Sequence, residues 1–231
     1  MGSHERVRSM RTHCRSSNKK MGGGELLTAN DLFYYIYGVL HVPAYRKKYA
    51  ANLRKALPRI PIPETLEEFQ VLAEAGKKLG KLHVNYEQAE EWPISFEKGG
   101  WEPAQGIQTV AWFQVGSRDM SHPRKARDKD QSRITYNDHI TIQGIPEEAY
   151  DYMVNGKPAI AWVMKRQRIK TDKASQIVND ANRFAIETMK DPAYPLRLLA
   201  KVITVSMETL KIVKKLSERE FSWERREASP S

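Results

Sequence analysis

The stretch Thr65-Leu-Glu-Glu-Phe-Gln-Val-Leu-Ala-Glu-Ala-Gly-Lys-Lys-Leu-Gly-Lys-Leu-His-Val-Asn-Tyr86 carries the clearest helical pattern in the chain. Its apolar residues recur at the spacing of one helix face, at Leu66, Phe69, Leu72, Leu79, Leu82 and Tyr86. Thr65 is expected to cap the helix, and the carboxylates of Glu67 and Glu68 stabilise its positive end. Gly76 and Gly80 each cost about 1 kcal/mol relative to alanine, so we expect another element to pack closely there.

The residues before this helix predict two more. One is expected over 31–40, which is apolar and aromatic and follows Thr28 and Asn30, either of which can cap a helix. Pro43 suits the first turn of the next helix. That helix has apolar residues at intervals of four, at Tyr45, Tyr49, Leu53 and Leu57. The prolines within 58–63 then end it and favour an extended connector.

Residues 92–145 have a different pattern, rich in β-branched and aromatic residues. Four short strands are expected, over 92–96, 108–115, 134–136 and 140–142. Asn137-Asp138 lies between the last two strands and is typical of a turn. A polar loop, 116–133, separates the second strand from the third.

Helical patterns return from Pro146. Shorter helices are expected over 146–153, 158–168 and 180–189. Pro195 begins a long last helix, in which apolar spacing over five turns outweighs the β-branched run 202–205 that favours a strand. Residues after Leu216 are charged and are expected to fray.

The order of these elements predicts one α+β domain with helical parts on both sides of a strand-rich middle. We expect a flexible basic leader over 1–27 and a charged tail over 217–231. The domain between them spans 28–216, with a helical part over 28–90, a strand-rich part over 91–145 and a second helical part over 146–216.

Composition narrows the function classes. The 231 residues carry a formal net charge of +10, and the resulting positive field attracts polyanions such as nucleic acid. The single cysteine, Cys14, permits no internal disulfide, which suits a reducing cytoplasm. The longest uncharged apolar run, Leu32 to Leu40, is too short to cross a bilayer, so a membrane-spanning role is not expected.

Motifs of catalysis are missing from the sequence. No phosphate-binding loop, dinucleotide-binding glycine turn, methyltransferase Asn-Pro-Pro-Tyr/Phe motif or Gly-x-Ser-x-Gly elbow occurs, and the six histidines lack metal-ligand spacing. Acidic pairs occur at 67–68, 90–91 and 147–148, and two of the three lie in first turns of expected helices, where carboxylates stabilise a helix end. We therefore expect a chain without catalytic residues, metal or cofactor.

Two clusters of cations are candidate contacts to DNA phosphates. The first, in the polar loop, comprises Arg118, Arg124, Lys125, Arg127, Lys129 and Arg133, and a solvated loop is an equally good interpretation. The second comprises Lys165, Arg166, Arg168, Lys170 and Lys173, where cations near the C-terminal end of a helix also stabilise its dipole. Three further candidates for contacts to bases are Tyr136, Asn137 and His139, although a simple turn also explains them.

Nine stretches, in this order, resemble one family: Asp31-Leu-Phe-Tyr-Tyr-Ile-Tyr-Gly-Val-Leu-His-Val-Pro-Ala-Tyr-Arg46, Leu57-Pro-Arg-Ile-Pro61, Ala75-Gly-Lys-Lys-Leu79, Leu82-His-Val-Asn-Tyr-Glu87, Ile134-Thr-Tyr-Asn-Asp-His-Ile-Thr-Ile142, Gly144-Ile-Pro-Glu-Glu-Ala-Tyr150, Val154-Asn-Gly-Lys157, Val178-Asn-Asp180 and Val202-Ile-Thr-Val-Ser-Met-Glu-Thr-Leu210. From about residue 29 to about residue 216, the chain is similar to the C-terminal specificity region of type ISP restriction–modification enzymes. Between Trp92 and Arg133 the similarity is loose.

The resemblance implies a function. In that family one long polypeptide carries a nuclease, an ATP-driven DNA translocase, an adenine-N6 methyltransferase and a C-terminal target-recognition region. This chain is therefore expected to bind double-stranded DNA and to position it for the methyltransferase, translocase and nuclease parts of the parent enzyme, without catalysis of its own. The alternative is a structural segment that docks on those parts and makes few DNA contacts.

Overall fold

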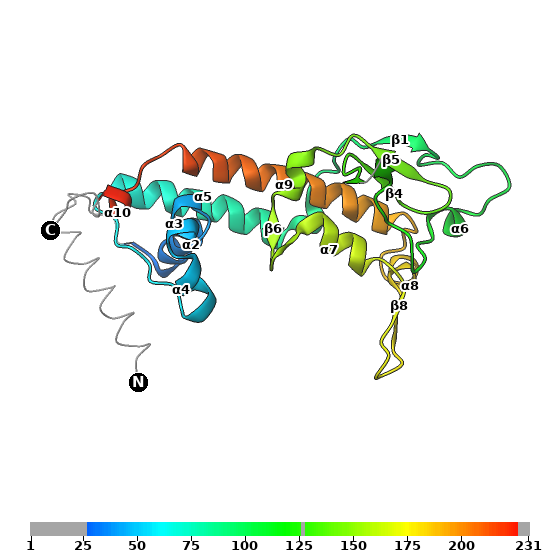
Figure 1. Ribbon diagram of the computed structural model, residues 1–231, viewed down its shortest axis with the longest axis horizontal. Helices are drawn as coiled ribbons and strands as arrows, with labels where there is room; N and C mark the ends of the chain where they lie inside the picture. The colour runs from blue at the N-terminus through cyan, green and yellow to red at the C-terminus, as the bar shows by residue number, and fades with distance from the viewer. Residues whose placement is uncertain (1–26, 126–127, 226–231) are drawn as a thin grey trace. The chain divides into compact units, whose positions relative to one another are not determined.

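The computed structural model describes residues 27–125 and 128–225, with backbone alone at 124, 125, 128, 129 and 225. The chain divides into two compact units, which are treated separately (Figure 1). Unit 1 contains the described residues up to Lys81 and those from Ile212 onward, and unit 2 spans Leu82–Lys211. Of the expected leader over 1–27, only Leu27 lies among the described residues.

Unit 1 is helical. Its elements are α2 (Ala29–Val39), α3 (Pro43–Lys48), α4 (Ala50–Lys55), α10 (Ser222–Arg225), most of α5 (Leu66–Val84) and the last residues of α9 (Tyr194–Ser217). Thr28 caps α2, because its hydroxyl accepts the Asp31 N–H while the Asp31 carboxylate accepts the Thr28 N–H. The single helix expected from Pro43 is two short helices, which meet at Tyr49, whose φ of −103° and ψ of 16° leave the helical region.

The prediction of a close approach at Gly76 is confirmed. A Cβ added at Gly76 would clash with the Tyr34 carbonyl oxygen of α2, and one added at Gly38 would clash with the Leu72 carbonyl oxygen of α5. Only glycines let two helix backbones come this near to each other. The α2–α5 contact therefore depends on a glycine from each helix.

An aromatic core holds unit 1 together. Tyr35 stacks on Phe69 with ring centres 4.9 Å apart, and its hydroxyl donates to the carbonyl of Pro61 in the extended connector. The expectation of fraying after Leu216 is wrong for the described part of the tail. Phe221 and Trp223 are buried in this core because they are large apolar side chains among charged neighbours.

Unit 2 contains a small antiparallel sheet in the order β1 (Ser95–Lys98), β5 (Thr141–Gln143), β4 (Arg133–Thr135). Ile142 pairs with Phe96 on one side and with Ile134 on the other. The two short strands expected around Asn137-Asp138 are confirmed, and the strand expected over 92–96 begins later, at Ser95.

Two expectations for unit 2 are wrong. Residues 108–115 contain a short helix, α6 (Thr109–Phe113), and no strand. The aromatic and β-branched residues there favour a strand locally, but the adjacent Trp112 and Phe113 are both buried, which a strand with one buried face does not allow. The helix expected over 146–153 is limited to the 3₁₀ turn η2 (Glu147–Tyr150).

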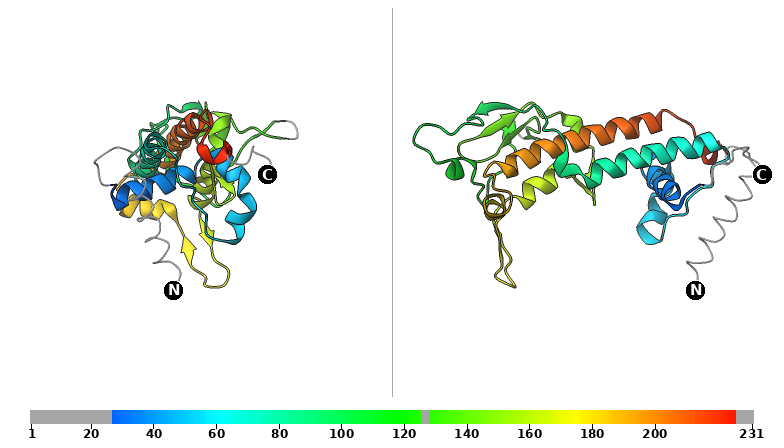
Figure 2. Two further views of the ribbon diagram at one scale, coloured as in Figure 1. Left: turned by 90° about the vertical axis from the view of Figure 1, so that its left-hand side faces the viewer. Right: turned by 180° about the vertical axis from the view of Figure 1, so that it is seen from behind.

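Three hairpins and several helices complete unit 2. They are η1 (Tyr86–Gln88), β2 (Arg124–Lys125) with β3 (Asp128–Lys129), β6 (Met153–Val154) with β7 (Lys157–Pro158), α7 (Ala159–Arg166), β8 (Lys170–Thr171) with β9 (Val178–Asn179), and α8 (Ala181–Glu187). Asn155 and Gly156 connect β6 to β7 with φ of 48° and 77°, the positive values that a tight hairpin turn requires. The β8–β9 hairpin projects from the body of its unit in Figures 1 and 2.

The core of unit 2 includes one face of α9, with Leu196, Leu199 and Ile203 fully buried. The run 202–205 is therefore helical, as its apolar spacing predicts, despite its β-branched residues. Among the described residues, no helix is both long enough and apolar enough to span a bilayer. The α+β class is confirmed, with helices at both ends of the chain and small sheets between them.

Gly76→Ala tests the α2–α5 contact. We expect the free energy of unfolding of unit 1 to fall by at least about 2 kcal/mol, although alanine favours the helix by about 1 kcal/mol, because the new Cβ meets backbone. Urea unfolding followed by circular dichroism measures the change. Gly80→Ala is the control, since its Cβ would meet side-chain atoms alone, the nearest being a ring carbon of Tyr34 at 3.0 Å. Equal effects of both substitutions would contradict the account.

Candidate nucleic-acid interface

Helix α7 separates apolar from basic residues. Ala159, Ile160 and Met164 are buried in the core of unit 2, whereas Lys165 and Arg166 in the last turn are exposed. This division follows from the three- to four-residue period of the apolar positions. The packing of α7 therefore directs its two C-terminal cations toward solvent.

Trp162 lies among three cations. The Nζ atoms of Lys157 and Lys165 are 5.2 Å and 5.8 Å from the ring centre, and the guanidinium carbon of Arg166 is 5.7 Å from it. The indole Nε1 donates to the Val154 carbonyl oxygen at 2.7 Å, which fixes the orientation of the ring. Trp162 thus gathers three positive side chains at one place.

These cations and Lys170 form a group that we call the α7 cluster: Lys157, Lys165, Arg166 and Lys170. Within the described part of the chain, none of the four is in an ion pair. The positive charges of Lys157 and Lys170 lower the pKa of Lys165. Because like charges this close repel one another, a bound polyanion would stabilise the cluster.

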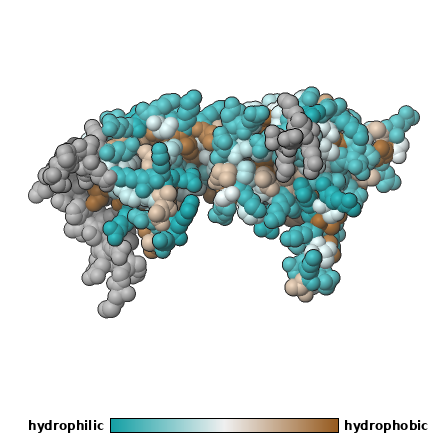
Figure 3. All heavy atoms as spheres, in the orientation of Figure 1, coloured by the Kyte–Doolittle hydropathy of each residue, from teal (hydrophilic) through white to brown (hydrophobic). Residues whose placement is uncertain are grey.

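The β8–β9 hairpin extends this basic surface. It begins at Lys170 and carries the exposed Lys173 and the exposed apolar side chains of Ile177 and Val178. Figure 3 shows it as a narrow extension with hydrophilic and hydrophobic residues side by side. A two-stranded ribbon of this kind fits the major groove of duplex DNA.

Arg168 differs from its basic neighbours. Its guanidinium donates to the Met120 carbonyl oxygen, and its buried Nε has no hydrogen-bond partner among the described residues. Met120 has a positive φ of 49°, so Arg168 contacts an unusual backbone conformation. The local role of Arg168 is therefore to hold the loop that contains Met120.

The loop cluster expected over 118–133 is described only in part. Arg118 is exposed. Arg124 pairs with Lys129, and Lys125 with Asp128, in the backbone register of the β2–β3 hairpin, and Arg127 lies outside the described residues. A role of these residues in DNA binding stays a prediction.

Arg133 lies within an ion-paired network. Its Nη1 is 2.7 Å from Glu97 of β1, and its Nε is 2.8 Å from Asp130. Hydrogen bonds from Ser132 and Arg133 lower the pKa of the Asp130 carboxyl. Arg133 therefore links β4 to β1, and its charge is already partly neutralised.

The three residues predicted to contact bases, Tyr136, Asn137 and His139, are buried or half-buried in unit 2. Tyr136 is buried and donates from its hydroxyl to the Phe113 carbonyl oxygen. Burial also raises the pKa of Tyr136. His139 is half-buried, and its ring stacks on Trp112 with centres 5.1 Å apart. A base-reading role of these residues stays a prediction, and their present contacts are structural.

Asn137 has a clear structural role. Its amide nitrogen donates to the carbonyl oxygens of Trp112 and Gln114, and its Oδ1 accepts the N–H groups of His139 and Ile140. These four bonds are made by a side chain that is 4% exposed. Asn137 therefore joins the turn between β4 and β5 to the end of α6.

Lys157 and Trp162 were not among the residues expected to bind DNA from the sequence. The spacing offered a signal for Trp162, because residues three and four positions apart lie together on a helix and Trp162 precedes Lys165 and Arg166 by these intervals. Lys157 precedes the helix, and only the β6–β7 turn brings it to Trp162. Across the part of the chain that the structure covers, no group of three metal-ligating side chains is found.

A comparison with models of known protein families shows the family to which the chain belongs. Residues 3–198 match the model of the Type ISP C-terminal specificity domain, so the chain belongs to this family. The resemblance stated from the sequence is thus confirmed. No curated protein matches the chain.

The chain is also similar to parts of several proteins of known structure. A nuclease-deletion mutant of the Type ISP restriction-modification enzyme LlaGI, in complex with a DNA substrate mimic, is 43% identical with a TM-score of 0.69 over 84% of this chain. The ATP-dependent Type ISP restriction-modification enzyme LlaBIII, bound to DNA, is 38% identical with a TM-score of 0.70 over 85%. A cryo-EM structure of a DrdV–DNA complex is 33% identical, with a TM-score of 0.65 over 84% of this chain. The matches span 14%, 12% and 18% of those chains, respectively.

Asn137→Ala tests the structural role of this residue. Removing its amide leaves two carbonyls and two N–H groups without their partner, so we expect unit 2 to lose at least about 2 kcal/mol of unfolding free energy. Chemical unfolding measures the loss, and the exposed neighbour Asp138→Ala is expected to change it by less than about 0.5 kcal/mol. Unchanged stability with weakened DNA binding would instead support a base contact.

Proposed function

We propose that this chain is a DNA target-recognition module of a Type ISP restriction–modification enzyme, acting in the cytoplasm. It binds duplex DNA and positions it for an adenine-N6 methyltransferase and for translocase and nuclease parts carried elsewhere in the parent enzyme. The module itself performs no catalysis. Membership of the specificity-domain family supports this proposal, as do relatives whose structures were solved as DNA complexes.

The observation that carries the proposal within this chain is the α7 cluster. Four cations that form no ion pair with any described residue lie together at the end of a packed helix and the start of a projecting hairpin. Cations on DNA-binding proteins neutralise phosphates and release counterions, which makes affinity depend steeply on salt. The geometry supports phosphate contacts from α7 that fix the orientation of the hairpin on the duplex.

A second function remains a candidate, in which the chain mainly docks on the rest of the parent enzyme. Exposed apolar side chains on α8 and its C-terminal side favour it, namely Phe184, Ile186 and Met189. Such residues suit contact with another protein surface better than contact with phosphates. The two functions differ in what the chain binds when it is alone.

Substitution of Lys165, Arg166 and Lys170 together by alanine tests the DNA contact. We expect the affinity for a labelled duplex to fall at low salt, and the slope of log affinity against log salt to become shallower by about 3, or about 1 per lost phosphate contact. Fluorescence anisotropy at several salt concentrations measures both.

The matched control replaces Arg183, Lys201 and Lys211 by alanine. It removes the same positive charge from unit 2 at residues that already bond to Glu187, Glu87 and Glu208. Its slope is expected to stay near that of the unchanged chain. Equal losses in both variants would show a general charge effect, and no binding of duplex DNA at low salt would favour the docking function.

The loop cluster provides a separate prediction. If the β2–β3 hairpin also contacts DNA, Arg124→Ala, Lys125→Ala and Arg127→Ala together weaken duplex binding and lower the salt slope by about 3. The same anisotropy titrations measure the effect. A slope equal to that of the unchanged chain would restrict the phosphate contacts to the α7 cluster and its surroundings.

A further inference from the structure

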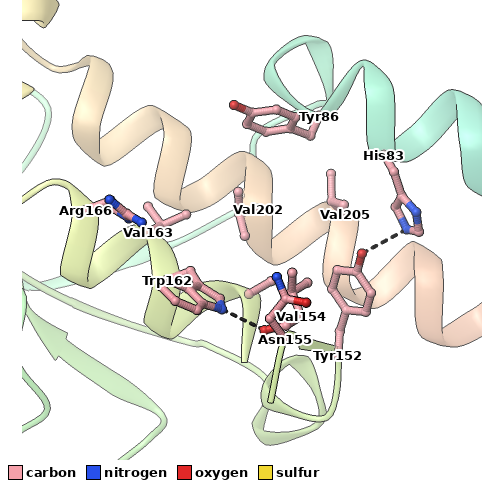
Figure 4. Close-up of a pocket in the computed structure, with 11 residues that line it drawn as sticks. His83, Tyr86, Tyr152, Val154, Asn155, Trp162, Val163, Arg166, Val202 and Val205 are labelled. Carbon is pink, nitrogen blue, oxygen red and sulfur yellow. Dashed lines mark hydrogen bonds between the residues drawn. The ribbon is translucent and has the colours of Figure 1, made fainter. Parts of the chain in front are cut away.

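Unit 2 contains a cavity of about 420 Å³ beside the α7 cluster (Figure 4). Its lining combines aromatic and aliphatic side chains from separate parts of the chain, chiefly His83, Tyr86, Tyr152, Trp162, Val202 and Val205. This size lies in the range of about 300–1,000 Å³ that is typical of ligand sites. The lining is mostly apolar and aromatic with a few polar groups, as is typical of sites for small organic ligands.

The aromatic side of the cavity is held in place by hydrogen bonds. The Tyr152 hydroxyl lies 3.2 Å from Nε2 of His83, and the same nitrogen lies 2.9 Å from the Thr209 hydroxyl on α9. The Tyr152 and His83 rings stack with centres 5.4 Å apart. Trp162 is fixed by its bond to the Val154 carbonyl oxygen. The cavity is therefore formed before any ligand binds.

Positive charge adjoins this apolar space. Arg166 lines the cavity directly, and Lys157 and Lys165 lie against the ring of Trp162, which forms part of the wall. Asn155 also lines it, and its amide makes no hydrogen bond within the described residues. Both a ring-shaped apolar group and a negative group thus find complementary surroundings within one site.

We infer that this cavity binds an unpaired nucleotide of a DNA strand. The base occupies the aromatic and aliphatic space, and its phosphate lies at Arg166, with Lys157 and Lys165 nearby. Charge complementarity selects this ligand, because an apolar side chain of a partner protein would leave the cations without anions. Proteins that hold an extruded base use aromatic and apolar walls in the same way. The inference rests on the proposed DNA binding.

The test compares three duplexes of one sequence: fully paired, with one extra unpaired thymidine, and with an extra abasic nucleotide at the same place. We expect the chain to bind the duplex with the unpaired thymidine about tenfold more tightly than the other two, a factor within the range of base–aromatic contacts. Fluorescence anisotropy at fixed low salt measures the three affinities. Equal affinities for all three duplexes would overturn the inference and leave the proposed function intact.

Val154→Trp blocks the cavity from its exposed edge, since Val154 lines the cavity and is 36% exposed. It is expected to abolish the preference for the unpaired thymidine and to change binding of the paired duplex by less than twofold. Met153→Trp is the control, because successive residues of a strand point to opposite sides and Met153 is outside the lining. A preference that persists in Val154→Trp would overturn the inference.

Two further results separate the possible failures. If Val154→Trp does not fold, Tyr86→Ala removes an aromatic wall that is 38% exposed and is expected to lower the preference. Free thymidine monophosphate that competes at micromolar concentration would identify a free nucleotide as the ligand and would contradict the assignment to a DNA strand. Absence of binding to every duplex would overturn the proposed function itself.

Discussion

The buried face of α9 is the constraint on which unit 2 depends. Leu196, Leu199 and Ile203 are fully buried in one core with Ile160 and Met164 of α7. Burial of such side chains contributes roughly 1.5–3 kcal/mol each, so α7 cannot rotate about its axis without losing a large part of the stability of the unit. The directions in which the polar residues of α7 point are therefore determined by the core.

This packing explains why positive side chains gather at the end of α7. Lys165 and Arg166 are exposed in the last turn of α7, and the hydrogen bond from Trp162 to Val154 holds the indole ring beside them and Lys157. Val202 and Val205 of α9 line the cavity next to this cluster. Like charges this close repel one another, and a bound polyanion would relieve that repulsion.

The sequence predicts the parts of the fold that depend on local patterns. The long helices α5 and α9, the glycine contact at Gly76 and the two strands around Asn137 follow from apolar spacing and turn chemistry. The strand predicted over 108–115 is wrong, because burial of Trp112 and Phe113 in the core overrides the local preference for a strand, and the segment forms α6. The candidate site is likewise predictable only where it depends on local sequence. Lys165 and Arg166 can be predicted from their charge, whereas Lys157 lies near Trp162 because the β6–β7 hairpin brings it there.

The central claim is that the α7 cluster lies against DNA. Acetylation of lysine side chains, with and without a saturating duplex, followed by mass spectrometry, tests this most directly. The account predicts strong protection of Lys157, Lys165 and Lys170, because phosphate contacts bury their amines, and little change at Lys201 and Lys211. Unchanged reactivity of all three cluster lysines while the duplex is bound would contradict it.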